Sequence, residues 1–229
     1  MNYNDTNPDY LASERLYSNT SMTGHKKFDD SGYLVLKNVI NAENFYSEIP
    51  TVKGQYTYAD STEHYMHKET EKQVPGSIAR YHYPPYKKYV YVIKKVIEES
   101  IGRKLYETYF YDRFYNPGQE LKIHTDRPAC EISMSIHIGT NLDEPWPFWI
   151  KTPDVYDDPL KKTKIIRKGK NKKIVLKPGD GLIYKGCERP HWREVLHGDP
   201  LDNNLYYHQI FFHYVLKDGI RAHHAFDRN

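Results

Sequence analysis

The residues whose types and spacing suggest chemistry begin with His124 and Asp126, an imidazole and a carboxylate separated by one threonine. They follow a strand-like run and precede Pro128. With 12 histidines among 229 residues, chance alone predicts about one such pair. A second pair, His197 and Asp199, is indeed present and serves as an internal comparison. The spacing is therefore a weak signal by itself, and the surrounding sequence has to separate the two pairs.

A third ligand is what separates them. Iron sites built from two histidines and one carboxylate need a ligand from a distant strand, and they leave the other face of the metal open. His191 lies 67 positions after His124, which is enough for several strands to run between them. The histidines after the comparison pair follow it too closely for a barrel to form between ligands. We therefore expect a site at His124, Asp126 and His191, and a surface turn at the second pair.

The elements that must position these residues are short strands. After Lys104 the chain consists of runs rich in Tyr, Ile, Val and Phe, separated by turn signals such as NPG, KPGDG and HGDP. Before them, apolar residues recur at helical spacing from Pro85 to Gly102, and Asn41 can cap a short helix that ends at Pro50. A mainly β fold with supporting helices, a jelly roll, is expected. The expected strands lie within 28–40 and at 105–115, 119–124, 131–138, 147–151, 172–177, 181–185, 191–196 and 205–215.

Composition indicates one soluble domain. The formal charge of +3 argues against a dedicated nucleic-acid binder. No apolar run has the roughly 18 residues that a membrane span needs, and the first residues lack the features of a signal peptide. Cys130 and Cys187 are too few for a disulfide scaffold, so we expect reduced thiols and a cytoplasmic protein. We expect a flexible arm at 1–27 and a single domain at 28–229.

One segment has an unusual composition. Residues 161–173 carry eight basic side chains and no acidic one, and they follow an acidic stretch at Asp154, Asp157 and Asp158. We expect a hairpin insertion at about 157–173. Two interpretations stay open: a solvated hairpin tip, or an electrostatic patch for an anionic substrate or a nucleic acid.

Two stretches carry a resemblance to a known family. FYNPGQELKIHTD and KPGDGLIYKGCERPHWR resemble the HxD and distal-histidine segments of iron(II)- and 2-oxoglutarate-dependent oxygenases with the double-stranded β-helix fold. FDDSGYLVLKNVI is similar to the opening of the prolyl hydroxylase and phytanoyl-CoA dioxygenase branches. The resemblance implies that His124, Asp126 and His191 bind iron(II). It also implies that 2-oxoglutarate and dioxygen are consumed, with succinate and carbon dioxide as co-products of hydroxylation.

The distal carboxylate of 2-oxoglutarate needs partners, because a buried anion without them is very costly. Many family members use a basic residue on the strand after the distal histidine. The corresponding strand here, residues 205–216, contains no Lys or Arg. We expect Arg193 in this role instead. It lies two residues after His191, and residues two apart on a strand face the same side. Its planar guanidinium suits a carboxylate. Pairing of Arg193 with Glu188 or Glu194 is the alternative.

Other cosubstrate contacts are less specific. Tyr115 and Ser135 could donate hydroxyls to the same carboxylate, and Lys151 and Lys185 are weaker substitutes for Arg193. The long polar segment 51–84 is expected to cover the mouth of the barrel.

The predicted activity is a dioxygenase that hydroxylates a small molecule or a protein side chain. The alternatives are a non-catalytic, cupin-like jelly roll that binds a metal or ligand, and a nucleic-acid-interacting module that uses residues 161–173. The oxygenase reading sets a geometric condition. Because ligand bonds span roughly 2.0 to 2.2 Å, Nε2 of His191 must lie within about 6 Å of the other two donor groups.

Overall fold

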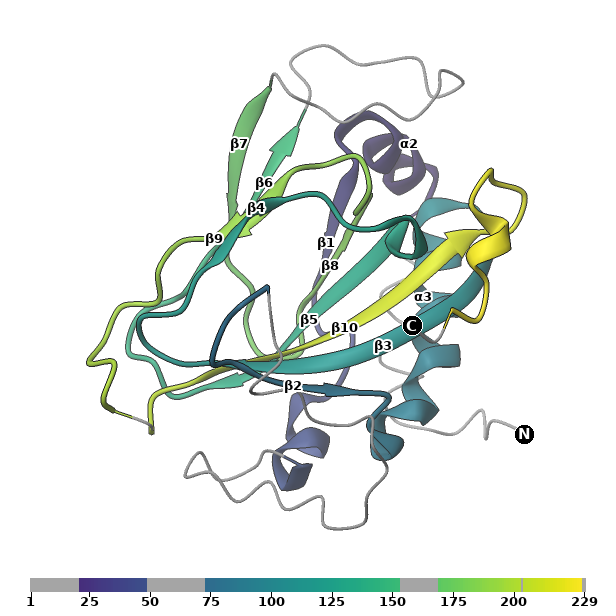
Figure 1. Ribbon diagram of the computed structural model, residues 1–229. Coiled ribbons are helices and arrows are strands. Elements are labelled where there is room, and N and C mark those ends of the chain that lie inside the picture. The colour runs from purple at the N-terminus through teal and green to yellow at the C-terminus, as the bar shows by residue number, and fades with distance from the viewer. Residues whose placement is uncertain (1–20, 49–72, 153–168, 203, 228–229) are drawn as a thin grey trace.

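The computed structural model describes residues 21–48, 73–152, 169–202 and 204–227, which form ten strands in two antiparallel sheets (Figure 1). Two α-helices, α2 (Ser21–Ser31) and α3 (Lys87–Ile101), and four 3-10 helices accompany them. The 3-10 helices are η1 (Ala42–Glu48), η2 (Pro84–Tyr86), η3 (Pro128–Cys130) and η4 (Ala222–His224). The strands are β1 (Tyr33–Leu36), β2 (Ile78–Tyr81), β3 (Leu105–Tyr115), β4 (Leu121–His124), β5 (Ile132–Thr140), β6 (Phe148–Thr152), β7 (Lys170–Ile174), β8 (Gly181–Tyr184), β9 (His191–Arg193) and β10 (Tyr207–Leu216).

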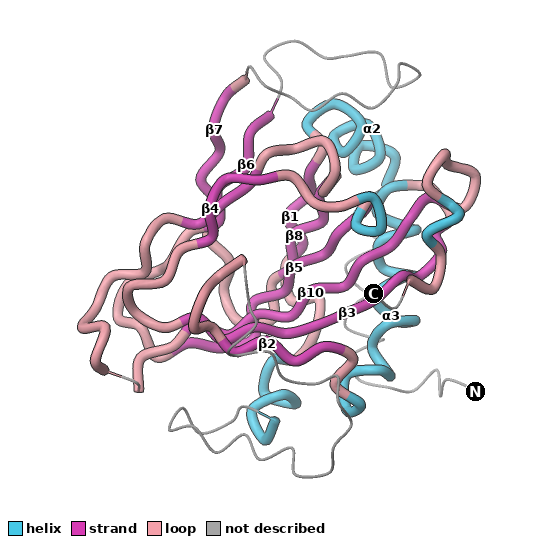
Figure 2. The backbone as a smooth tube through the Cα atoms, in the orientation of Figure 1, coloured by secondary structure: helices cyan, strands magenta, loops and turns pink. Residues whose placement is uncertain are grey.

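The two sheets face each other and form a jelly roll. The larger sheet has the strand order β1-β8-β5-β10-β3-β2, and the smaller has β4-β9-β6-β7. Figure 2 shows the smaller sheet folded over the larger one, with α3 behind the larger sheet and α2 at the upper end of β1. The expected fold class is confirmed, and every strand expected after Lys104 is present with its ends shifted by a few residues at most.

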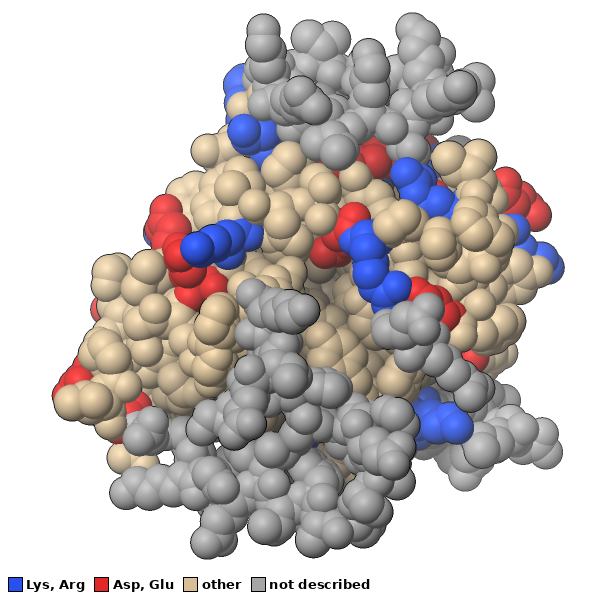
Figure 3. All heavy atoms as spheres, in the orientation of Figure 1, with Lys and Arg blue, Asp and Glu red and all other residues tan. Residues whose placement is uncertain are grey.

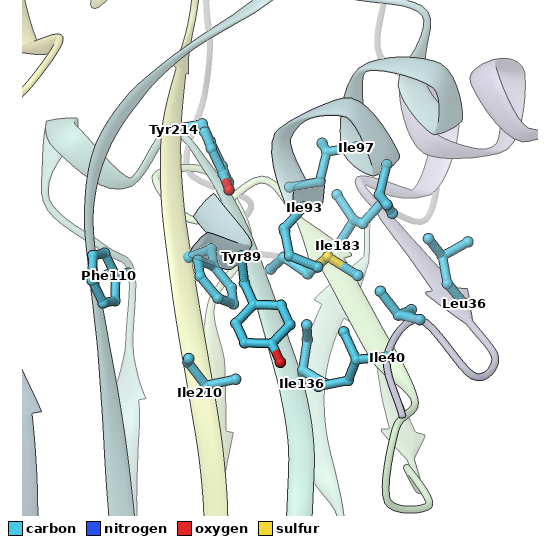
Figure 4. Close-up of a cluster of buried hydrophobic side chains, with 14 of the residues drawn as sticks. Leu36, Ile40, Tyr89, Ile93, Ile97, Phe110, Ile136, Ile183, Ile210 and Tyr214 are labelled. Atoms are coloured by element: carbon cyan, nitrogen blue, oxygen red, sulfur yellow. The ribbon is translucent and has the colours of Figure 1, made fainter. Parts of the chain in front are cut away.

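The larger sheet is buried on both faces. Ile136 on β5 and Ile210 on β10 face the helices and pack with Ile93 and Ile97 of α3 (Figure 4). The residues that alternate with them face the other way, into the barrel. β10 therefore has nine buried residues among its ten, and the sheet separates an apolar core from a polar interior.

Helix α3 ends as the sequence predicts. Gly102 adopts a φ of 67°, and its N–H donates to the carbonyl of Glu98, which is a left-handed C-cap. The first turn of the expected helix is the 3-10 helix η2, and the helix expected after Asn41 is the 3-10 helix η1.

A buried ion pair attaches β2 to the sheet. The guanidinium of Arg80 contacts both oxygens of Asp112, and Nε2 of His208 donates to Oδ2 of the same carboxylate over 2.8 Å. The ring of His208 stacks on Phe114 with centroids 3.8 Å apart. Arg80 is 1% exposed and Asp112 is completely buried, so each charge depends on its partner. This network joins β2, β3 and β10.

Two elements differ from the sequence predictions. β2 lies inside the segment 51–84, which we expected to cover the mouth of the barrel. The sequence did not indicate this strand, because four residues are too few to show an alternating pattern. α2 begins at Ser21, inside the segment expected to be an arm, and Phe28 on it is buried in the core. Residues 161–168 of the basic segment lie outside the described part of the chain. Among the described residues no helix is long and apolar enough to span a membrane.

Acid should destabilise this fold through its buried histidines. Burial lowers the pKa of His137 and of His208 to about 4, whereas an unfolded histidine titrates near 6.5. The unfolded chain therefore binds more protons between these values, and the free energy of unfolding should fall as pH drops from about 7 toward 4. Each histidine should contribute up to ~1.4 kcal/mol per pH unit. Urea titrations at several pH values would measure the slope.

The matched comparison uses two variants. His137→Gln should reduce the slope of unfolding free energy against pH by up to ~1.4 kcal/mol per pH unit, the contribution of one proton. His197→Gln, at an exposed position, should leave the slope unchanged. Equal slopes for the two variants would contradict the assignment of His137 as a buried neutral group.

Candidate metal centre

The pairing of β4 with β9 brings the predicted ligands together. His124 lies directly opposite His191 in the ladder, and Ile150 of β6 lies opposite His191 on its other side. Nε2 of each histidine is 3.4 Å from Oδ1 of Asp126, and the three donor atoms lie within 4.8 Å of one another. The geometric condition set by the sequence is met. Two ligands bound at right angles to one ion are ~3.0 Å apart, which is close to these separations.

Backbone carbonyls set the tautomer of both imidazoles. Nδ1 of His124 lies 2.8 Å from the carbonyl oxygen of Lys122, and Nδ1 of His191 lies 2.9 Å from that of Arg189. A carbonyl can only accept, so each Nδ1 carries the proton and each Nε2 presents a lone pair. This arrangement orients histidine ligands in metal sites. Both lone pairs are directed toward the Asp126 carboxylate.

Asp126 is held as an ionised carboxylate. Its N–H donates to the carbonyl of Gly186 over 2.9 Å, and Ser133 Oγ donates to Oδ2 over 3.2 Å. Burial raises the pKa of Asp126, but the proximity of His191 and His124 outweighs burial and holds that pKa well below its usual range. The site therefore combines one negative oxygen with two neutral nitrogen donors, a donor set that suits a divalent transition metal.

The two histidines have different surroundings. His191 is 1% exposed, and its ring stacks on Phe148 and meets the edge of Tyr184. The side chain of His124 is 23% exposed, and its Nε2 lies 2.9 Å from the Gln73 amide nitrogen. The site is thus closed by aromatic rings on one side and accessible on the other. Figure 3 shows one face of the molecule, with a hollow near its middle beside an acidic and a basic side chain.

Arg193 faces the barrel interior, on the same side of β9 as His191. It is 1% exposed, and its guanidinium donates to the Trp146 carbonyl over 2.6 Å and to Gln209 Oε1 over 2.7 Å. No carboxylate among the described residues lies within ion-pair distance of it. Glu188 contacts Arg189 instead, and Glu194 is exposed. The predicted alternative, pairing of Arg193 with a nearby acid, is wrong.

Several buried donors in the barrel interior lack protein partners. Within the described chain, Arg193 Nε, Ser135 Oγ and Gln209 Nε2 have no hydrogen-bond partner. Tyr115 is completely buried, and its hydroxyl accepts a long hydrogen bond of 3.4 Å from Arg113. Buried donors left unsatisfied cost free energy, so such a group marks a place suited to a polar guest. Lys185 does not belong to this group of donors, because its Nζ lies above the Phe28 ring of α2.

The sequence analysis missed other residues of the site. Nδ1 of His213 lies 2.9 Å from Ser133 Oγ, next to Asp126, although we had considered His213 only as a neighbour of the comparison pair. The one available signal was the even spacing of His213 from Gln209 on a strand. The comparison pair itself is exposed, which confirms the expected surface turn.

Comparison with known proteins supports the fold. No protein-family model and no curated protein matches this chain. Several solved structures do match it. A Pseudomonas putida prolyl-4-hydroxylase is 11% identical with a TM-score of 0.57, covering 83% of this chain and 97% of its own. A 2OG-Fe(II) oxygenase family protein from Burkholderia pseudomallei is 11% identical with a TM-score of 0.59, covering 90% and 93%.

A third structure contains ligands. HygX from Streptomyces hygroscopicus, with nickel, 2-oxoglutarate and hygromycin B bound, is 12% identical with a TM-score of 0.60, covering 86% of this chain and 88% of its own. At these identities the similarity establishes the architecture. The chain has the jelly-roll fold seen in structures of 2-oxoglutarate- and iron(II)-dependent oxygenases.

Proposed function

We propose that this protein is an iron(II)- and 2-oxoglutarate-dependent dioxygenase that hydroxylates a small molecule or a protein side chain. The observation that carries the proposal is the convergence of His124, Asp126 and His191 inside an oxygenase-type barrel. Two neutral imidazole nitrogens and one carboxylate oxygen form the donor set of iron(II) oxygenases.

The three side chains would hold the ion from one side only. His191 would bind it from the closed wall of Phe148 and Tyr184, and His124 from the accessible side. Iron(II) in this site would supply activation of dioxygen, coupled to oxidative decarboxylation of 2-oxoglutarate to succinate and carbon dioxide. The aromatic wall would exclude water from the His191 side, and the partly exposed side at His124 would admit substrate.

The cosubstrate has a matching environment. Arg193 would bind the distal carboxylate of 2-oxoglutarate with its planar guanidinium, and Tyr115 and Ser135 would contribute hydroxyl groups. The buried donors without partners support this assignment, because a dicarboxylate would satisfy them. The HygX structure with bound 2-oxoglutarate supports it by its similar fold. The aromatic rings of Trp146 and Tyr207 beside the guanidinium would keep it oriented.

The remaining assignments are coarser. A small-molecule or protein substrate is proposed because the similar structures include a prolyl hydroxylase and a protein with bound hygromycin B. A single domain over 28–229 with a hairpin insertion at 157–173 stays a prediction. The basic residues Lys170, Lys172 and Lys173 are exposed on β7, two strands from β9, and the proposed oxygenase function assigns them no role.

Divalent metal should stabilise the parent protein. Binding to the folded state alone raises the midpoint of thermal unfolding in proportion to the logarithm of metal concentration. We expect manganese(II), added to tag-free protein stripped with a chelator, to raise the midpoint, and Asp126→Ala to abolish the increase. His197→Ala is the matched control and should respond as the parent does. An equal increase in Asp126→Ala would place the metal elsewhere.

Turnover tests the activity directly. With iron(II), ascorbate and 2-oxoglutarate in air, the parent should form succinate even without a prime substrate, at a slow uncoupled rate. His124→Ala and Asp126→Ala should lower this rate by at least 100-fold, since each removes a ligand. Succinate can be quantified by mass spectrometry. If the parent bound metal but formed no succinate with any candidate substrate, the non-catalytic jelly roll would be the better description.

Calorimetry tests the role of Arg193. With manganese(II) in place of iron, 2-oxoglutarate should bind the parent 10- to 100-fold more tightly than it binds Arg193→Met, because a charged hydrogen bond is worth about 1.5 to 3 kcal/mol. Pyruvate has the same 2-oxo acid end and no distal carboxylate. Its affinity should be the same for both proteins. Equal loss of affinity for both acids would show that the variant disturbs the whole site.

A further inference from the structure

A second polar cluster lies behind Asp126, on the side away from the two imidazoles. Ser133 Oγ lies 3.2 Å from Asp126 Oδ2, and His213 Nδ1 lies 2.9 Å from the same Oγ. Asp126, Cys130 and His213 also have donor atoms within 4.8 Å of one another. The cluster joins the loop after β4 to η3, β5 and β10. The proposed function assigns it no role.

The hydrogen bonds of this cluster have one consistent direction. Ser133 Oγ has one proton and two acceptors in reach, Asp126 Oδ2 at 3.2 Å and the Cys130 carbonyl oxygen at 3.3 Å. We assign the proton to Asp126 Oδ2, because an ionised carboxylate is the stronger acceptor. Ser133 Oγ then accepts from His213, which fixes the proton of His213 on Nδ1. The chain of donors runs from His213 through Ser133 to the carboxylate. Because it ends on a negative charge, its last bond is stronger than one between neutral groups.

The cluster is shielded from water. Ser133 is completely buried, and His213 is 3% exposed, with aromatic rings of Tyr109 and Tyr111 next to it. The hydroxyl of Tyr109 lies 3.1 Å from the Cys130 sulfur and occupies the remaining side of the cluster. In such surroundings water competes little for the hydrogen bond from Ser133 to Oδ2, so this bond restrains rotation of the carboxylate.

A glycine provides the space for this carboxylate. A Cβ atom on Gly186 would lie 2.3 Å from Asp126 Oδ2 and 3.0 Å from Ser133 Oγ. The same residue accepts a hydrogen bond from the Asp126 N–H. Gly186 therefore fixes the backbone of Asp126 and leaves room for Oδ2 to reach Ser133.

We infer that Ser133 and His213 are positioning residues, which hold Asp126 so that Oδ1 alone faces the two histidines. The inference rests on the proposed metal site and deepens it, because it assigns the control of carboxylate orientation to two residues that do not bind the ion. Groups that hydrogen-bond to metal ligands commonly change metal affinity by 10- to 100-fold.

The test measures metal binding apart from turnover. We expect Ser133→Ala and His213→Phe to weaken manganese(II) binding by 10- to 100-fold in titrations monitored by electron paramagnetic resonance. His213→Asn places an amide nitrogen at the same number of bonds as Nδ1, so it should restore most of the affinity. Ser100→Ala removes another buried serine, in α3, and should leave the affinity unchanged.

A spectroscopic readout separates orientation from folding. A released carboxylate can bind through both oxygens, so cobalt(II) in Ser133→Ala should show weaker visible absorption than in the parent, as expected for a higher coordination number. The thermal midpoints of Ser133→Ala and Ser100→Ala, without metal, show how much either substitution affects folding.

The outcomes are distinguishable. If the parent binds no metal, the proposed function fails and the inference fails with it. If the parent binds metal and forms succinate, but Ser133→Ala and His213→Phe match its affinity within twofold and its cobalt spectrum, only the inference is overturned.

Discussion

The pairing of His124 with His191 across β4 and β9 is the constraint on which the candidate site depends. The paired residues Leu121 and His124 are three positions apart on β4, whereas their partners Arg193 and His191 are two positions apart on β9. A bulge absorbs the extra residue, so all four side chains can face the interior. A slip of one residue would bring Trp192 inward in place of His191 and remove the site.

Charge gives the interior a second constraint. The Asp126 carboxylate and the Arg193 guanidinium do not contact each other. A divalent cation would compensate the negative charge of Asp126, and a carboxylate group would compensate the positive charge of Arg193. Buried charges are tolerated when they are compensated and hydrogen-bonded. The separation of Asp126 from Arg193 is therefore expected if two oppositely charged guests occupy the barrel together.

Much of this arrangement could be predicted from the sequence, because strands report which side chains share a face. The two-residue spacing of His191 and Arg193 correctly placed both in the interior. Contacts between strands could not be predicted in this way. The meeting of Ser133 with His213 depends on the register of β5 and β10, which shifts at His208. Arg80 gave no local sign that its burial against Asp112 attaches β2 to the sheet.

The amide of Gln73 approaches the same Nε2 of His124 that a metal ion requires, and Arg113 donates to the other end of that amide. The ion and the amide must therefore compete for one lone pair. Whatever draws Gln73 away from His124 would increase the affinity for the ion, and by thermodynamic reciprocity the ion would favour the displaced position of Gln73. Loading of the metal and the path of the chain that enters β2 are in this way linked equilibria.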